Sequence, residues 1–250
     1  MTKKIAGFSS AKDAASTIMI VFLILVTIIL GVKIYQTIAE YRINREKYRE
    51  LSESVTRSEG NSLRDSFTVD FDKLRRTNPD VVGWIRCKGT VIDYPIVQGN
   101  DNTKYLRTMF DGSYGICGTL FVDAAATDPF DQFNTIVYGH HMKDGSMFGS
   151  LKKFRELSYC RKHPKMVLAT PEGSFDLQIW AFLNQPSDSL VFTNNVEGYE
   201  EKNAYIEWIR NKVEYTTDVE VDISDQIVVL STCAYEYAGA RYIVVCKKLK

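Results

Sequence analysis

The chain has 250 residues, of which 45% are hydrophobic and 25% are charged, and its 31 Lys and Arg residues balance its 31 Asp and Glu residues. This is the composition of an ordinary globular protein, long enough for one or two domains. The formal net charge is zero and no basic cluster alternates with aromatic residues, so we expect no nucleic-acid partner.

The N-terminal region carries a long apolar segment. Residues 14–32 contain no charged side chain, and a helix rising about 1.5 Å per residue would nearly cross a ~30 Å hydrocarbon core over that length. A cleaved signal peptide is the alternative, but its apolar region is usually about 7–15 residues and ends at a small-residue cleavage site. Such a site is missing around Lys33. We therefore predict an uncleaved transmembrane signal anchor at residues 14–35, preceded by a short cytoplasmic tail at residues 1–13.

The segment that follows is strongly charged. Lys and Arg residues lie on both sides of the anchor, so charge counting alone leaves its orientation open. Residues 36–68 are rich in Arg, Glu, Lys and Ser, which is typical of a solvated helical stalk or a flexible linker. We expect this stalk to hold a C-terminal domain, residues 69–250, away from the membrane.

The C-terminal domain is predicted to be mainly β, because short apolar segments alternate there with turn residues. Pro95 predicts an edge strand or a bulge. Helices are expected over residues 147–157 and 196–213, the latter because Tyr205 and Ile209 recur on one helical face. The predicted strands are residues 81–87, 90–94, 118–122, 135–138, 165–169, 175–183, 227–233 and 241–245.

The number of cysteines indicates that at least one thiol is unpaired. There are five of them, an odd number, and no CxxC pair indicates a zinc knuckle or a redox motif. Cys233 closes the predicted strand 227–233 and Arg241 opens the next one. A lone cysteine is commonly a buried structural residue. The other interpretation is a nucleophile beside a cation that stabilises a developing oxyanion.

Two adjacent histidines follow another predicted strand. His140 and His141 come directly after Gly139 at the end of strand 135–138. Neighbouring residues on an extended chain point to opposite faces, so the two imidazoles are poorly placed to share one metal ion. The nearby aspartates show no calcium-loop pattern either. We expect no metal and no cofactor.

Cys233, His140 and Arg241 together form a set suited to acyl transfer through a thioester. A neighbouring imidazole favours the reactive thiolate and can protonate a departing amine. A guanidinium presents fixed N–H donors to a substrate carbonyl or an oxyanion.

Several ordered motifs resemble class B sortases. Leu230-Ser231-Thr232-Cys233 followed by Arg241 resembles the TLxTC…R signature of sortases, with Val229 in place of its first Thr. The resemblance covers the chain from about residue 71 to its end. The other segments that resemble this class are residues 78–85, 94–102, 138–142 and 144–148.

The resemblance implies a fold and a location. The fold is an eight-stranded sortase-type β-barrel with peripheral helices, preceded by one N-terminal transmembrane helix. The predicted helix 196–213 matches the extra helix that precedes the cysteine strand in class B. Sortases are cysteine transpeptidases anchored in the cell membrane of mainly Gram-positive bacteria, with the catalytic domain on the extracellular face.

The resemblance also implies a reaction. Cys233 would attack the Thr carbonyl of an NPQTN-like C-terminal sorting motif of secreted proteins, with His140 as general acid and base and Arg241 steadying the substrate and the oxyanion. An amine of a peptidoglycan precursor or cross-bridge would then resolve the thioester and join the protein to the cell wall. The family pattern adds four substrate-binding positions, which are Asn102, Leu106, Tyr138 and Ser231.

These assignments leave alternatives open. Leu106 and Tyr138 could equally be packing residues, whereas Ser231 shares its strand face with Cys233 by alternation. His141 has no assigned role. The same fold would also suit a cysteine peptidase or a pilus-type polymerising sortase, and a non-enzymatic, membrane-tethered binding module would keep Cys233 merely buried.

Overall fold

The computed structural model describes residues 6–58 and 67–249. Residues 1–5 of the predicted tail and residues 59–66 of the predicted stalk lie outside the described residues. The chain divides into two compact units, Met1–Ile43 and Asn44–Lys250.

The elements follow one another along the chain, with η marking 3-10 helices. Their bounds are α1 (Ala6–Val55), β1 (Thr56–Ser58), β2 (Phe67–Val69), α2 (Phe71–Thr77), β3 (Val81–Arg86), β4 (Asp93–Val97), η1 (Lys104–Leu106), β5 (Leu120–Val122), β6 (Asn134–Tyr138), η2 (Phe148–Arg155), α3 (Leu157–Lys162), β7 (Lys165–Thr170), β8 (Gly173–Pro186), η3 (Leu190–Phe192), α4 (Tyr199–Lys212), β9 (Tyr215–Thr216), β10 (Gln226–Cys233) and β11 (Ala240–Lys248).

The first unit holds the apolar part of α1. Its large side chains, such as Phe22 and Leu25, are exposed. Among the described residues, α1 is the helix that is long and apolar enough to cross a membrane, judged by length and composition. The long apolar helix expected near the N-terminus is therefore present.

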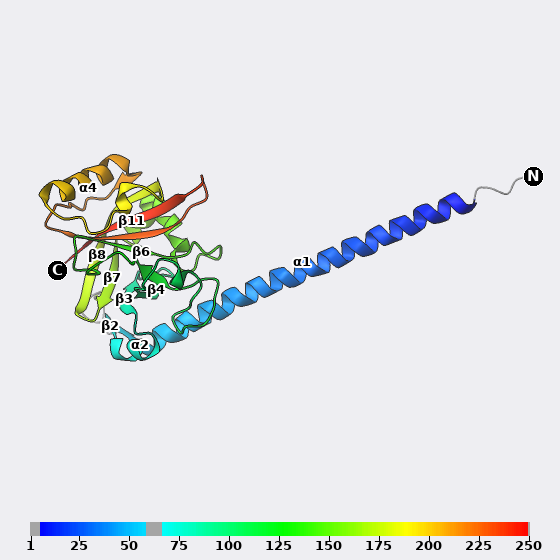
Figure 1. Cartoon of the computed structure of the whole chain (residues 1–250), viewed down its shortest axis with the longest axis horizontal. Helices are drawn as coiled ribbons and strands as arrows, with labels where there is room; N and C mark the ends of the chain where they lie inside the picture. The colour runs from blue at the N-terminus through cyan, green and yellow to red at the C-terminus, as the bar shows by residue number, and fades with distance from the viewer. Residues whose placement is uncertain (1–5, 59–66, 250) are drawn as a thin grey trace, which may run out of the picture. The chain divides into compact units, whose positions relative to one another are not determined.

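Eight strands of the second unit close into a barrel (Figure 1). They pair in the order β11–β10–β6–β5–β4–β3–β7–β8, and β8 returns to pair with β11 along Leu177–Pro186. The short β9 adds to β8 outside this ring. The expected eight-stranded barrel is confirmed, and its strands match the predicted segments, except that the one predicted at 90–94 begins at Asp93.

Helix α4 covers one face of the barrel, over β6, β8, β10 and β11 (Figure 1). Tyr205 and Ile209 on the helix are buried against β-strand residues such as Val229 and Val245. Burying such side chains contributes about 1.5–3 kcal/mol each, which fixes the helix on these strands. The helical face predicted from Tyr205 and Ile209 is therefore its packing face.

Two local predictions need correction. β4 is not an edge strand, because it pairs with β3 on one side and with β5 on the other. The other alternative predicted from Pro95, a bulge, is present in the β3–β4 pairing, whose register shifts between Val81 and Gly83, opposite Val97 and Ile96. Pairing with β5 begins only at Ile96, so Pro95 sits where its missing N–H is not needed for that ladder. The helix predicted at 147–157 is instead the 3-10 helix η2 followed by α3.

The end of α1 also differs from a fully solvated stalk. Tyr48 and Val55 are buried, as are the polar residues Asn44 and Ser52. These positions recur every three or four residues and share one face of the helix. The many charged residues between them point elsewhere and obscure this face in the sequence. The compact second unit thus begins inside the range predicted as the stalk, at Asn44.

Candidate active site

Three neighbouring strands bring the predicted catalytic residues together. β10 pairs in antiparallel register with β11, and Cys233 lies directly opposite Arg241. Residues opposite each other in such a ladder have Cβ atoms about 4.5–5.5 Å apart. β10 also pairs in parallel register with β6, which places Ser231 beside Tyr138. Alternation puts all four side chains on the same face as Val229, and Tyr138 packs at the border of the hydrophobic cluster that holds α4.

This face opens into a pocket of about 320 Å³. The pocket contains every site residue predicted from the sequence, three for catalysis and four for substrate binding. The neighbouring walls come from β5, η3 and the segment after β8. Its lining residues are Asn102, Leu106, Phe121, Tyr138, Gly139, His140, Ser187, Phe192, Ser231, Thr232, Cys233 and Arg241.

Cys233 differs from the other cysteines in its exposure. Cys87, Cys117, Cys160 and Cys246 are buried, whereas Cys233 is half-buried and opens into the pocket. Burial raises the pKa of the Cys87 thiol to about 11 and raises the pKa of Cys246 as well, which keeps both as inert thiols. The solvent-accessible thiol is therefore that of Cys233, opposite Arg241 in the β10–β11 pairing, while the Arg241 guanidinium donates to the carbonyl oxygen of Ala240 over 3.1 Å.

His140 is held by a backbone contact. Its Nε2 donates a hydrogen bond to the carbonyl oxygen of Leu106 over 2.7 Å. A carbonyl can only accept, so this contact places a proton on Nε2 and leaves Nδ1 as the basic nitrogen of the neutral ring. Burial lowers the pKa of His140 below its ordinary value of 6.5; the Leu106 bond acts in the opposite direction, and nearby Arg107 lowers the pKa further.

The lowered pKa predicts a pH-dependent stability. The unfolded chain binds more protons than the folded chain between the folded-state pKa and 6.5. The contribution of His140 to the free energy of unfolding is therefore fully present above pH 6.5, and it is lost as the pH decreases through this window. The His140→Gln variant cannot titrate here, so its melting temperature should fall less than that of the wild type between about pH 7.5 and pH 5.5. Parallel losses in the two proteins would contradict the assignment.

The remaining predicted residues form the pocket walls. The Tyr138 hydroxyl donates to Asp123 over 3.0 Å, and its ring stacks on Phe192 with centroids 6.2 Å apart. Asn102 accepts a hydrogen bond from the Ala124 N–H over 2.8 Å. Both side chains thus have structural partners while also facing the pocket.

Ser231, in contrast, is buried in the pocket wall without such a partner. Its hydroxyl is fully buried, and no described residue bonds to its Oγ. An unpaired buried hydroxyl costs about 1–3 kcal/mol. Ser231 lies in the wall of the pocket, beside Cys233.

Sequence reasoning gave His141 no role, yet the structure places it against the cysteine. Its Nδ1 donates to the carbonyl oxygen of Cys233 over 2.5 Å, and its ring packs near Tyr235 and Tyr242. The opposite orientation of two adjacent side chains, already visible in the sequence, sends His140 into the pocket and His141 to the backbone end of β10.

A metal centre finds no support in the arrangement of the described side chains. Within residues 14–58 and 67–249, no three His, Cys, Asp or Glu residues come together in a way that could hold an ion.

Known proteins share this sequence and this arrangement. Residues 85–249 match the model of the sortase domain. Sortase B of Staphylococcus aureus is 30% identical over 236 residues, which cover 94% of this chain and 96% of that protein. The chain belongs to the sortase family. Sortase B of Listeria monocytogenes is 32% identical over 173 residues, 68% of this chain and 70% of that protein.

Solved structures place the chain in class B of the family. Sortase B from B. anthracis in complex with AAEK1 is 33% identical, with a TM-score of 0.73 over 85% of this chain and 99% of that one. The S. aureus sortase B–substrate complex is 27% identical, with the same TM-score and coverage. This class B sortase is thus an enzyme, a cysteine transpeptidase.

Proposed function

We propose that this class B sortase cleaves an NPQTN-like sorting motif near the C-terminus of secreted proteins and transfers them to an amine of peptidoglycan. The proposal rests on one observation above all. The half-buried Cys233 shares a single pocket with His140 and Arg241. A thiol, an acid–base group and a fixed cation are what acyl transfer through a thioester requires.

The first half of the reaction forms the thioester. The thiolate of Cys233 attacks the carbonyl carbon of the motif's Thr, and Arg241 donates hydrogen bonds to the resulting oxyanion. The carbon–nitrogen bond then breaks, and the departing amine takes a proton from the His140 imidazolium. Because Nε2 donates to Leu106, we assign this proton transfer to Nδ1.

The second half releases the product. The acceptor amine attacks the thioester carbonyl and gives a proton to the neutral His140. The carbon–sulfur bond breaks, the thiolate of Cys233 is restored, and the new bond is an amide. Water in place of the amine would give hydrolysis, so exclusion of water during the thioester stage favours transfer.

We assign the binding of the sorting motif to the pocket walls. Tyr138 and Leu106 supply apolar surface, while Asn102 and Ser231 supply polar contacts. The unpaired hydroxyl of Ser231, next to the scissile carbonyl bound at Cys233, would donate to a backbone carbonyl of the motif.

The location follows from the same proposal. The apolar part of α1 would anchor the enzyme in the cell membrane as a single span, with the catalytic unit on the extracellular face, where secreted proteins and peptidoglycan meet it. The length and composition of α1 support a span but do not give its direction.

Product analysis tests the proposal. The full chain, solubilised in detergent, is incubated with peptides that carry NPQTN-like or LPxTG-like motifs and with an amine acceptor. We expect cleavage after Thr of the NPQTN-like peptide, an amide to the acceptor, and a thioester on the Cys233 peptide by mass spectrometry. Hydrolysis alone would instead indicate a cysteine peptidase, and joining only to a pilin lysine would indicate a polymerising sortase.

The Ser231→Ala variant should change the stability of the fold and the binding of the sorting motif in opposite directions. Removing an unpaired buried hydroxyl should raise the free energy of unfolding by about 1 kcal/mol, or about 2–4 °C in Tm for a domain of this size. The same change should lower kcat/KM about tenfold, the value of one lost hydrogen bond to the bound motif.

A matched control is available in η2. Ser150 is also buried with an unpaired Oγ, but it lies outside the active-site pocket. Ser150→Ala should give a similar gain in Tm with unchanged kcat/KM. If Ser231→Ala behaves in the same way as this control, the hydroxyl does not contact the substrate.

A further inference from the structure

The last turns of α1, residues 44–55, contact both chain segments that hold His140. One is the segment 105–119, whose Leu106 carbonyl accepts the hydrogen bond from His140 Nε2 over 2.7 Å. The other is the loop 142–148 that follows the two histidines, whose Phe148 N–H donates to the His140 carbonyl over 3.1 Å. The imidazole and the backbone of this residue are thus held from two sides.

The contact with the first segment runs through Tyr48. Its buried hydroxyl donates to the carbonyl of Gly118 over 2.5 Å and lies 3.1 Å from the Thr119 hydroxyl. The Thr119 N–H in turn donates to the carbonyl of Tyr105 over 3.0 Å. Tyr105 directly precedes Leu106. The helix is thus joined to the carbonyl that bonds to His140 by the Tyr48–Thr119 and Thr119–Tyr105 hydrogen bonds and by the Tyr105–Leu106 peptide link.

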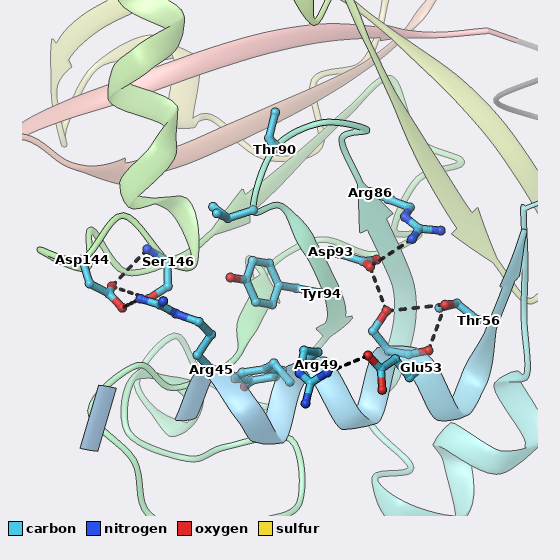
Figure 2. A pocket seen from close by; sticks show the side chains of 13 residues that line it. Arg45, Arg49, Glu53, Thr56, Arg86, Thr90, Asp93, Tyr94, Asp144 and Ser146 are labelled. Carbon is cyan, nitrogen blue, oxygen red and sulfur yellow. Dashed lines mark hydrogen bonds and ion pairs between the residues drawn. The ribbon is translucent and has the colours of Figure 1, made fainter. Parts of the chain in front are cut away.

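The contact with the second segment runs through Tyr94 and Arg45. The ring of Tyr48 packs edge-on against Tyr94, with centroids 5.4 Å apart, and the Tyr94 hydroxyl accepts from the Met147 N–H over 3.1 Å. Figure 2 shows Tyr94 between α1 and this loop, and Arg45 reaching Asp144 over 2.7 Å. Asp144 itself accepts from the Ser146 N–H and hydroxyl.

The two contacts differ in strength. The Arg45 side chain is 62% exposed, and ion pairs at such positions are screened by solvent and salt. The Tyr48 hydroxyl is buried, so its hydrogen bonds have no competition from water. Tyr48 is therefore the principal contact of the two.

We propose that the end of α1, through Tyr48, is a positioning element for the imidazole of His140. The helix that carries the apolar N-terminal segment would then form part of the catalytic unit, and displacement of residues 44–55 would lower the rate of proton transfer. This inference rests on the proposed role of His140 as general acid and base.

The test uses Tyr48→Phe in the full chain in detergent, because this change removes the hydroxyl and keeps the ring. We expect kcat for transfer to an amine acceptor to fall about five- to twentyfold with KM within about twofold, since a misplaced general acid affects the chemical step. Two controls should retain wild-type activity. Arg49→Ala is on the same turns, but among the described residues its ion pairs are with Glu46 and Glu53, and Tyr199→Phe removes an exposed hydroxyl.

A spectroscopic readout distinguishes positioning from general destabilisation. The chain has only three histidines, so selective ¹⁵N labelling can resolve the two ring nitrogens of His140 and report its tautomer. In the wild type the neutral ring should carry its proton on Nε2; in Tyr48→Phe the two ¹⁵N shifts should move toward those of a mixed tautomer.

The outcomes separate this inference from the proposed function. If His140→Gln keeps its activity, the role of His140 fails and the positioning inference fails with it. If His140→Gln is inactive while Tyr48→Phe matches the wild type in kcat and in ¹⁵N shifts, the positioning inference alone is overturned.

Discussion

Replacing Cys233 by alanine should abolish transpeptidation while leaving the fold intact. Removing the nucleophile from an enzyme whose catalytic groups act as a unit lowers kcat by about 10⁴- to 10⁶-fold. The thiol is half-buried and lines an open pocket, so its loss leaves no closed cavity. The measurement is the rate of amide formation with a sorting-motif peptide, together with Tm as a check of folding.

A second cysteine provides the matched control for this variant. Cys160 is buried in α3, away from the pocket, and burial raises the pKa of its thiol. Cys160→Ala should therefore retain activity, and iodoacetamide should modify Cys233 first in the wild type. Normal turnover by Cys233→Ala would contradict the assignment of Cys233 as the nucleophile. Equal alkylation of all five thiols would contradict the expected higher reactivity of the Cys233 thiol.

The largest effect on stability is expected for Gly118→Ala. Gly118 has φ +55°, and a Cβ there would lie 2.2 Å from the carbonyl oxygen of Tyr105 and 2.8 Å from that of Leu106. Neither backbone oxygen can turn aside as the end of a side chain could. Backbone strain together with this displacement should cost about 3–5 kcal/mol, or roughly 10 °C in Tm.

The displaced Leu106 carbonyl also bonds to His140, so residual folded Gly118→Ala protein should have a reduced kcat. Gly112→Ala is the control, because Gly112 has a similar φ of +81° with nothing within 4 Å of an added Cβ. Gly112→Ala should lose only the free energy of unfolding that backbone strain at a positive φ costs, about 1 kcal/mol. Equal destabilisation of the two variants would mean that the close approach at Gly118 is unimportant. Thermal unfolding followed by circular dichroism measures both.

The strands and the helix over β6, β8, β10 and β11 were predictable because their signals are local. Alternating or continuous apolar segments with turn residues between them indicate strands, and Tyr205 with Ile209 marked the face of α4. The buried face at the end of α1 was missed for the opposite reason. Only Tyr48 and Val55 among its inward residues are large and apolar, and the charged residues around them dominate the pattern.

The candidate site was predictable as a set of residues but not as an arrangement. Strand ends, a glycine before His140 and the spacing of Cys233 and Arg241 indicated the chemistry, and the ordered motifs indicated the family. The sequence showed that His140 and His141 point to opposite faces, but not that His141 contacts the Cys233 carbonyl or that the Ser231 hydroxyl is unpaired, because each depends on which groups lie nearby in space.

Local sequence patterns were thus enough to predict the apolar N-terminal segment, the β class and a candidate thiol, imidazole and guanidinium. Folding is what puts Cys233 opposite Arg241, the Leu106 carbonyl against His140, and Tyr48 against Gly118 in the segment 105–119. Side-chain type and local periodicity can be read directly from the sequence. Strand register and contacts between residues far apart arise only when the whole barrel closes and its buried polar groups find partners.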